Sequence, residues 1–118
     1  MTENRTPEQL ARLYFDCWKR GDLTDLAPHL ADDVTFDGPL ADLTGRDACL
    51  EGLTGLAGAT TQLNVRRRLA DDTDVMTWFD LGVGQADPTP VVNWCECADG
   101  LIRHIRVTFD PRGILAAG

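Results

Sequence analysis

The side chains that could carry acid–base chemistry are spread along the chain rather than gathered in one motif. Tyr14 falls within an apolar helical repeat, Asn93 within an apolar strand, and Asp80 between Phe79 and Leu81 of another strand. A carboxylate in an apolar pocket has its pKa raised towards that of a general base. A phenol or an amide can donate hydrogen bonds to an oxygen that gains charge. Together these residue types could donate hydrogen bonds and accept a proton.

The two histidines are expected to lie outside any pocket. His29 follows Pro28 on a short amphipathic segment, which predicts an exposed side chain. His104 alternates with Arg106 in a strand whose other positions are apolar. Because successive strand residues point to opposite faces, both of these side chains should point away from the core.

The cysteine pattern indicates buried thiols rather than disulfides or a metal site. Cys95 and Cys97 alternate along an apolar strand and would share a face, where small thiols pack well. No histidine lies at a zinc-ligand spacing from them. Four cysteines in a chain of this kind suit a reducing compartment. We therefore expect no bound metal.

Length and composition predict one globular domain over residues 1–118. The 118 residues are 43% hydrophobic and 25% charged, which is ordinary for a packed protein. The net charge of −8 argues against nucleic acid or an anionic membrane as a partner. No apolar stretch is long enough to cross a bilayer, and the start lacks a signal-peptide pattern, so a cytoplasmic location without membrane contact is expected.

The first helix has the clearest signals. Thr6 can cap a helix that starts at Pro7, and Gln9 stands where a capping box needs it. Gly21 is expected to end the helix. Apolar residues recur at helical spacing and form one stripe, which consists of Leu10, Leu13, Tyr14, Cys17 and Trp18.

The elements that follow predict an α+β fold. A short second helix is expected over 22–30, capped by Asp22 or Thr24, and a strand over 34–37 follows it. A third helix is expected over 44–56, with Thr44 as its cap. The rest of the chain is expected to form an antiparallel meander with strands at 61–69, 75–83, 89–97 and 101–109. Helices on one side of a curved sheet account for this order.

The last turn decides which way Asn93 points. We expect a three-residue loop over 98–100 that pairs Cys97 with Leu101, which places Asn93 on the inner face with Ile105. A two-residue turn would instead pair Ala98 with Leu101.

Several segments resemble one superfamily. The run Tyr14…Gly21-Asp22-Leu23…Leu30-Ala31-Asp32-Asp33-Val34-Thr35-Phe36 is similar to the opening of bacterial ketosteroid isomerases. Gly45-Arg46-Asp47-Ala48, and Asp99-Gly100-Leu101-Ile102 leading to Phe109-Asp110, resemble the SnoaL-like branch. The resemblance implies the cone-shaped NTF2-like, or cystatin-like, fold, with three N-terminal helices packed in a curved, mostly antiparallel sheet around an apolar pocket. It also implies a dimer and no cofactor.

Carried over residue by residue, the isomerase pattern is retained in part. Tyr14 matches the tyrosine that donates a hydrogen bond to the substrate oxygen. The second donor, a protonated aspartic acid in the isomerases, becomes Asn93. The general base falls on Gly38, and its neighbour Asp37 would point to the opposite face unless the chain bends.

A second comparison bears on the face that Asp80 occupies. In limonene epoxide hydrolases a middle-strand Arg-x-Asp faces the pocket and resembles Trp78-Phe79-Asp80, with the Arg lost. Their second Asp falls on Val107. The resemblance therefore turns Trp78 and Asp80 inwards, whereas the apolar alternation of residues 75–83 turns them outwards. We take Asp80 as the candidate for proton transfer, with Asp37 as the alternative.

These observations lead to three hypotheses. The first is a cofactor-free enzyme of the ketosteroid isomerase or polyketide cyclase type, acting on a hydrophobic small molecule. The second is a non-catalytic ligand-binding or dimerisation module, and the third is an epoxide hydrolase. The expected catalytic residues are Tyr14, Asp80, Asn93 and Asp37, and the expected ligand-binding residues are Trp18, Phe36, Trp78, Phe79, Ile105, Val107 and Phe109. A homodimer through the open sheet face is expected, with Trp94, His104 and Arg106 at the contact.

Overall fold

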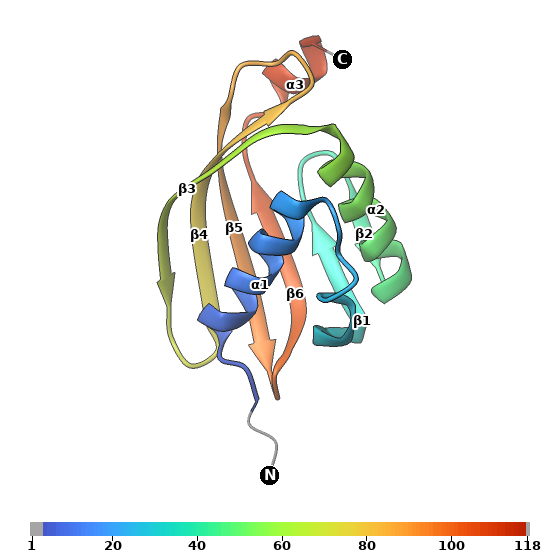
Figure 1. The fold of residues 1–118 in the computed structure, drawn as a ribbon, viewed down its shortest axis with the longest axis vertical. Coiled ribbons are helices and arrows are strands. Elements are labelled where there is room, and N and C mark those ends of the chain that lie inside the picture. Colours follow the sequence, from blue (N-terminus) through green and yellow to red (C-terminus); the bar gives the residue numbers. More distant parts are fainter. Residues whose placement is uncertain (1–3, 118) are drawn as a thin grey trace.

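The computed structural model describes residues 4–117, which form helices packed on one face of a six-stranded sheet (Figure 1). The sheet order is β2-β1-β6-β5-β4-β3, and β1 pairs with β6 in parallel while every other pairing is antiparallel. The elements are α1 (Pro7–Arg20), a 3-10 turn (Ala27–His29), β1 (Leu30–Asp37), β2 (Asp42–Thr44), α2 (Arg46–Ala59), β3 (Thr60–Ala70), β4 (Asp74–Val83), β5 (Thr89–Ala98), β6 (Leu101–Thr108) and α3 (Arg112–Ala117). The expected α+β class is confirmed.

The first helix, α1, has the termini expected from its sequence. Thr6 and Gln9 form the reciprocal capping box, and Pro7 occupies the first helical position. Gly21 ends the helix with φ of 74°, in the left-handed region that glycine adopts without strain. The apolar stripe packs on the inner face of the sheet, so α1 carries Tyr14 into the core.

The expected second helix is wrong. Only the single 3-10 turn at Ala27–His29 forms between α1 and β1. Ala27 still donates a helical hydrogen bond to Leu23, but Pro28 has no backbone N–H with which to make the next one. The N-terminal half therefore contains two helices rather than three, and α3 adds a short helix at the C-terminal end.

The third expected helix begins later than expected. Thr44 is not its cap, because it belongs to β2 and pairs with Thr35 of β1. Gly45, with φ of 96°, turns the chain from this strand into α2 and donates its backbone N–H to Val34. Because β2 is only three residues long, propensity alone did not reveal it.

The β5–β6 hairpin also differs from the expected turn. Ala98 pairs with Leu101, so the turn has two residues, Asp99 and Gly100. Both have positive φ, 56° and 75°, as a type I′ turn requires. The expected three-residue loop, with Cys97 opposite Leu101, is therefore wrong.

A bulge compensates for the shorter turn. Glu96 pairs with His104 but Cys97 pairs with Ile102, which leaves Arg103 as an extra residue in β6. Beyond the bulge Asn93 is opposite Val107 rather than Ile105, but its side chain points to the same face of the sheet as in the expected register. Asn93 therefore lies on the inner face, where its side chain is 2% exposed, although the reason differs from the expected one.

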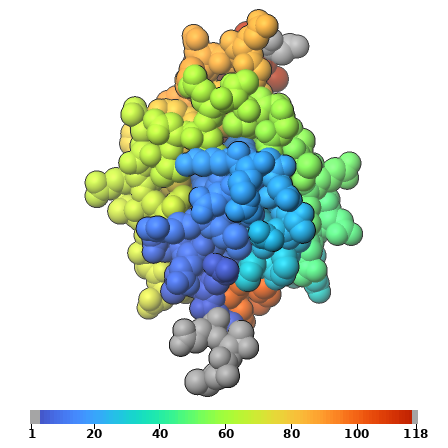
Figure 2. All heavy atoms as spheres, in the orientation of Figure 1, coloured from blue at the N-terminus to red at the C-terminus, as the bar shows by residue number. Residues whose placement is uncertain are grey.

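The core lies between the sheet and the helices α1 and α2. In the space-filling view, α1 and the segment that follows it cover the centre of this face, with α2 beside them (Figure 2). Phe15 and Trp18 of α1 both meet Phe79 of β4 edge-on, with ring centroids 5.0 and 5.4 Å apart. None of the described helices is long and apolar enough to span a membrane.

Candidate functional site

A largely apolar cavity of about 260 Å³ lies between the sheet and the helices, at the end of the core away from the β5–β6 turn. Drug-sized ligands usually occupy pockets of about 300–1,000 Å³, so this one suits a smaller molecule. Its walls come from α1, α2 and the inner faces of the strands, with Ile114 of α3 at its rim. The side chains with polar groups in its wall are Tyr14, Asn93 and Trp18.

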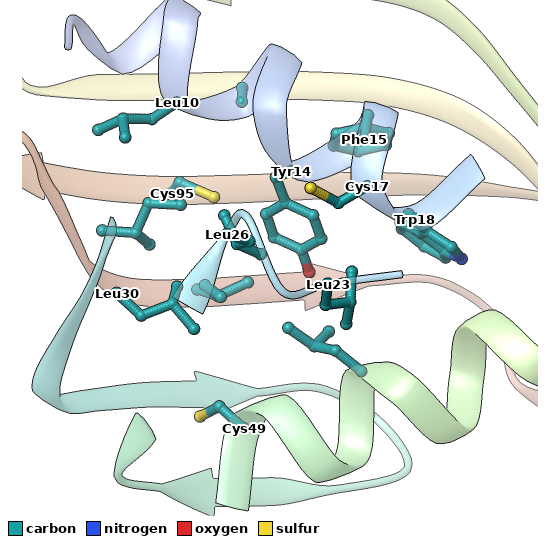
Figure 3. Packing of buried hydrophobic residues seen from close by; sticks show 14 of the residues in the cluster. Leu10, Tyr14, Phe15, Cys17, Trp18, Leu23, Leu26, Leu30, Cys49 and Cys95 are labelled. Atoms are coloured by element: carbon teal, nitrogen blue, oxygen red, sulfur yellow. The ribbon is translucent and has the colours of Figure 1, made fainter. Parts of the chain in front are cut away.

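Tyr14 projects its ring from α1 into the core. Figure 3 shows the phenol extending away from α1 towards the side of α2. The residue is 1% exposed, and burial raises the pKa of its phenol far above the usual value. Cys95 adds to this shift, while the nearby Asn93 side chain opposes it. The phenol therefore stays protonated and can donate a hydrogen bond into the cavity.

Asn93 supplies a second donor. The thiol of Cys95 donates to its Oδ1 over 3.2 Å, which orients the amide. Its Nδ2 is buried and makes no hydrogen bond of full geometry among the residues described, although the amide lies close enough to the Tyr14 phenol to oppose the rise of its pKa. An unpaired buried N–H group costs about 1–3 kcal/mol, and a ligand oxygen in the cavity could satisfy it. The amide and the phenol thus form a pair of donors facing an apolar space.

The wall position at which the isomerase pattern expects a base is Gly38. This residue lines the cavity and offers no side chain. Asp37 points to the opposite face, where its Oδ2 lies 2.7 Å from Nε2 of His104 and its side chain is 51% exposed. A one-residue shift along β1 has turned the carboxylate outwards, so Asp37 is not in the cavity.

Asp80 does not line the cavity either. Between residues 75 and 81 of β4 the buried positions are the odd-numbered ones, including Thr77, Phe79 and Leu81, so Asp80 and Trp78 lie on the outer face of the sheet. Asp80 pairs there with Arg66 over 3.1 Å, and Trp78 is 54% exposed. The inward placement of these two residues is wrong, because the apolar alternation of the strand decides its orientation.

Most of the expected ligand-binding residues do line the cavity. They are Trp18, Phe36, Phe79, Val107 and Phe109. Ile105 is fully buried in the core beyond the cavity wall, and Trp78 lies on the other face of the sheet. The sequence analysis missed Leu43 of β2 and Ile114 of α3, since neither element was expected. Leu53 and Leu56 could have been inferred from the apolar spacing of the third helix.

The outer face of the sheet carries a polar network around Trp94. The guanidinium of Arg106 stacks on the indole ring at 4.6 Å, and Trp94 Nε1 donates to Asp74 over 2.6 Å. Arg106 also pairs with Glu96 over 2.8 Å. His104 lies on this same face, as expected from its alternation with Arg106. None of these groups belongs to the cavity.

The four cysteines are free and buried. Burial raises the pKa of the Cys95 and Cys97 thiols, which keeps them protonated and unreactive. Within residues 4–117 no group of three or more histidine, cysteine or acidic side chains is placed to hold a metal ion.

A larger hollow of about 780 Å³ lies near the start of α1 and the β5–β6 turn. It is lined mainly by charged and polar side chains, several of which are already paired, such as Glu8 with Arg12 and Asp99 with Arg103. The smaller cavity is the better candidate because it combines apolar walls with an unpaired buried donor.

The comparison with known families agrees with this architecture. The sequence profile of the SnoaL-like domain matches residues 11–105, which includes every element from α1 to most of β6. The chain belongs to the SnoaL-like domain family. Both donors, Tyr14 and Asn93, fall within the matched region of this SnoaL-like chain. No curated protein matches its sequence.

Solved structures, NTF2-like proteins among them, share the fold of this SnoaL-like chain. A candidate ketosteroid isomerase from Kribbella flavida is 30% identical, with a TM-score of 0.76, over 86% of this chain and 75% of that one. A steroid delta-isomerase from Pseudomonas aeruginosa is 22% identical, with a TM-score of 0.80 and coverages of 98% and 90%. An NTF2-like protein of unknown function from Cytophaga hutchinsonii is 17% identical, with a TM-score of 0.85 and coverages of 98% and 99%.

Proposed function

We propose that this SnoaL-like domain binds a small apolar molecule in the cone and holds one of its oxygen atoms with Tyr14 and Asn93. The unpaired Nδ2 of Asn93 carries this proposal, because a donor that is buried and unsatisfied in the free protein gains a full hydrogen bond when a ligand enters. The apolar wall excludes ligands with several polar groups, since each would lose its hydration without compensation. A compact aryl or alicyclic ketone has the matching chemistry.

Binding without proton abstraction is the form of this function that the site supports best. The described wall contains no carboxylate and no imidazole, and its donors are Tyr14, Asn93 and Trp18, of which Trp18 already donates its Nε1 to Thr60. A general base must come within hydrogen-bonding distance of the proton that it removes. Asp37 and Asp80 both point to the other face of the sheet, so neither reaches the cavity.

The second candidate is an isomerase or cyclase that acts through an enol. Its support is the pair of donors itself, because hydrogen bonds aimed at a carbonyl oxygen are worth more as that oxygen becomes an enolate. The 30% identical structure named as a candidate ketosteroid isomerase also favours it. In this case the proton would have to leave to water or to a group of the substrate.

Acetophenone separates the two candidates. It is small enough for the cavity, has one acceptor oxygen, and has methyl protons next to the carbonyl group. Calorimetric titration measures its binding, and proton NMR in D₂O measures exchange of its methyl protons. Binding with exchange at the buffer rate supports the binding module, whereas binding with accelerated exchange supports the enzyme. A failure of acetophenone and of its alicyclic analogue acetylcyclohexane to bind would contradict both.

We also propose that the domain pairs with a second copy through the outer face of the sheet. An apolar row crosses this face from the exposed Leu69 and Met76 to the half-buried Trp94, which are register partners on neighbouring strands. Trp78 adds further exposed apolar surface. Anionic groups such as Glu96 lie beside cationic ones such as Arg106, so the face can complement itself across a two-fold axis.

A further inference from the structure

Arg68 is a cation on the inner face of the sheet that lacks a carboxylate partner. Its Nε donates to the hydroxyl of Thr77 over 3.0 Å, and its guanidinium lies 5.2 Å from the centroid of the Phe15 ring. Its Nη2 is buried without a hydrogen-bond partner, and no acidic side chain of residues 4–117 pairs with it. Arg68 as a whole is half-buried and lines the larger polar hollow at the start of α1, so the unpartnered group is its Nη2, which points to a role beyond packing.

The register of the strands connects Arg68 to the candidate site. Arg68 of β3 is opposite Thr77 of β4, and Thr77 is opposite Asn93 of β5. Thr77 and Asn93 are 1% and 2% exposed, so the three side chains form one polar row across the inner face. Two strand spacings separate the ends of the row, which places the Cα atoms of Arg68 and Asn93 about 10 Å apart.

The positive charge of Arg68 acts electrostatically on groups within the core. Burial raises the pKa of Cys95, and the guanidinium opposes this rise, so its field reaches the thiol that orients Asn93. On the solvent side, Glu8, Arg12 and Asp16 of α1 also act on Arg68. These groups lie on the water-exposed side of α1, where screening weakens their effect on the core.

We propose that Arg68 makes the cavity favour ligands whose oxygen carries or gains negative charge, such as carboxylates and enolates, over neutral molecules of the same shape. The proposal rests on the proposed function, because Arg68 acts on the oxygen that Tyr14 and Asn93 hold. Arg68 does not touch the ligand. It acts at a distance, through the electrostatic field of its guanidinium. A unit charge about 10 Å away at an effective dielectric constant near 20 changes the affinity for an anion by about tenfold or more.

The test compares acetophenone with benzoate, which has nearly the same shape but carries a charge. Both are titrated calorimetrically at pH 7 into the wild type, Arg68→Met and Arg68→Lys, with thermal unfolding as a check of folding. We expect the affinity ratio of benzoate to acetophenone to fall about tenfold in Arg68→Met. Arg68→Lys, which keeps the charge, should restore most of it. A structural role alone would weaken both ligands equally and leave the ratio unchanged.

The outcomes separate the two proposals. If the wild type binds neither ligand, the proposed function fails and the role of Arg68 falls with it. If both ligands bind and the ratio is unchanged in a folded Arg68→Met, the role of Arg68 is overturned while the site stands. If Arg68→Met does not fold, Arg68→Gln, which also removes the charge, gives the same comparison. An unchanged ratio in a folded Arg68→Gln is equally decisive against Arg68.

Discussion

Asn93 is a buried amide of which only one end is hydrogen-bonded. Its Oδ1 accepts from the Cys95 thiol, whereas its Nδ2 makes no hydrogen bond of full geometry within the described chain. Replacing an unsatisfied polar group by an apolar one of similar volume removes a desolvation cost. An incompletely satisfied amide in the wall of a cavity is therefore better explained by ligand binding than by stabilisation of the fold.

Asn93→Leu should therefore raise the free energy of unfolding by about 1 kcal/mol, as measured by urea denaturation. The same substitution should weaken acetophenone binding. Asn64→Leu, which changes an exposed amide on β3, is the matched control and should stay within about 0.5 kcal/mol of the wild type. A clear loss of stability in Asn93→Leu would show that the amide is a structural part of the core.

Gly38 is the residue whose identity separates this chain from the isomerase pattern. Its backbone accepts a side chain, and an added Cβ would approach Phe36 Cε1 at 3.3 Å, which a small movement of that ring relieves. Gly38→Asp should place a carboxylate in the cavity wall and accelerate exchange of the acetophenone methyl protons by about a hundredfold. Asp37→Asn is the control and should change nothing, since Asp37 lies outside. A folded Gly38→Asp that binds without exchange would show that more than the base is missing.

At the scale of elements, α1 positions the phenol and depends on its capping box. Thr6→Ala removes the side chain that accepts from Gln9 and should lower the free energy of unfolding by about 1 kcal/mol. Thr54→Ala, at an exposed position within α2, should cause no such loss. Equal stabilities of the two variants in urea would mean that the tertiary packing of α1 makes its cap unnecessary.

The elements also show what the sequence could and could not reveal. The caps of α1 and the long strands β3 to β6 follow from local signals, and the structure confirms them within a few residues. The strand β2 and the bulge at Arg103 do not, because β2 is only three residues long and the bulge is defined by the pairing of β6 with β5 rather than by its own residues. The prediction that Asn93 points inwards is right although the turn on which it depends is wrong, because the bulge offsets the shorter turn.

For the site, the isomerase resemblance indicated both donors, Tyr14 and Asn93. The orientation of Asp80 could not be read as simply, because the apolar alternation of β4 and the comparison with epoxide hydrolases gave opposite predictions. The alternation of apolar residues in β4 turned it outwards, against the comparison with epoxide hydrolases. Burying one face of a strand fixes the orientation of all its side chains, so a single carboxylate cannot turn inwards alone. The apolar pattern was the more reliable guide because it reflects the larger burial energy.

At the scale of the whole molecule, the outer sheet face should set the oligomeric state. We expect a dimeric mass by light scattering at micromolar concentration. Met76→Glu should give monomers, because it places a charge in the middle of the apolar row. Leu115→Glu, at an exposed apolar position on α3, is the control and should stay dimeric. A monomeric wild type would leave the exposed apolar row without the proposed partner.

The most direct measurement of the proposed site is the ¹³C NMR shift of acetophenone labelled at the carbonyl carbon and bound in the cavity. Hydrogen bonds from Tyr14 and Asn93 withdraw electron density from that carbon, so its resonance should move downfield from its value in an apolar solvent. Each of Tyr14→Phe and Asn93→Leu should reduce this displacement by a substantial part. A bound ketone whose carbonyl resonance stays at the apolar-solvent value, and is the same in both variants, would contradict the proposed role of the two donors.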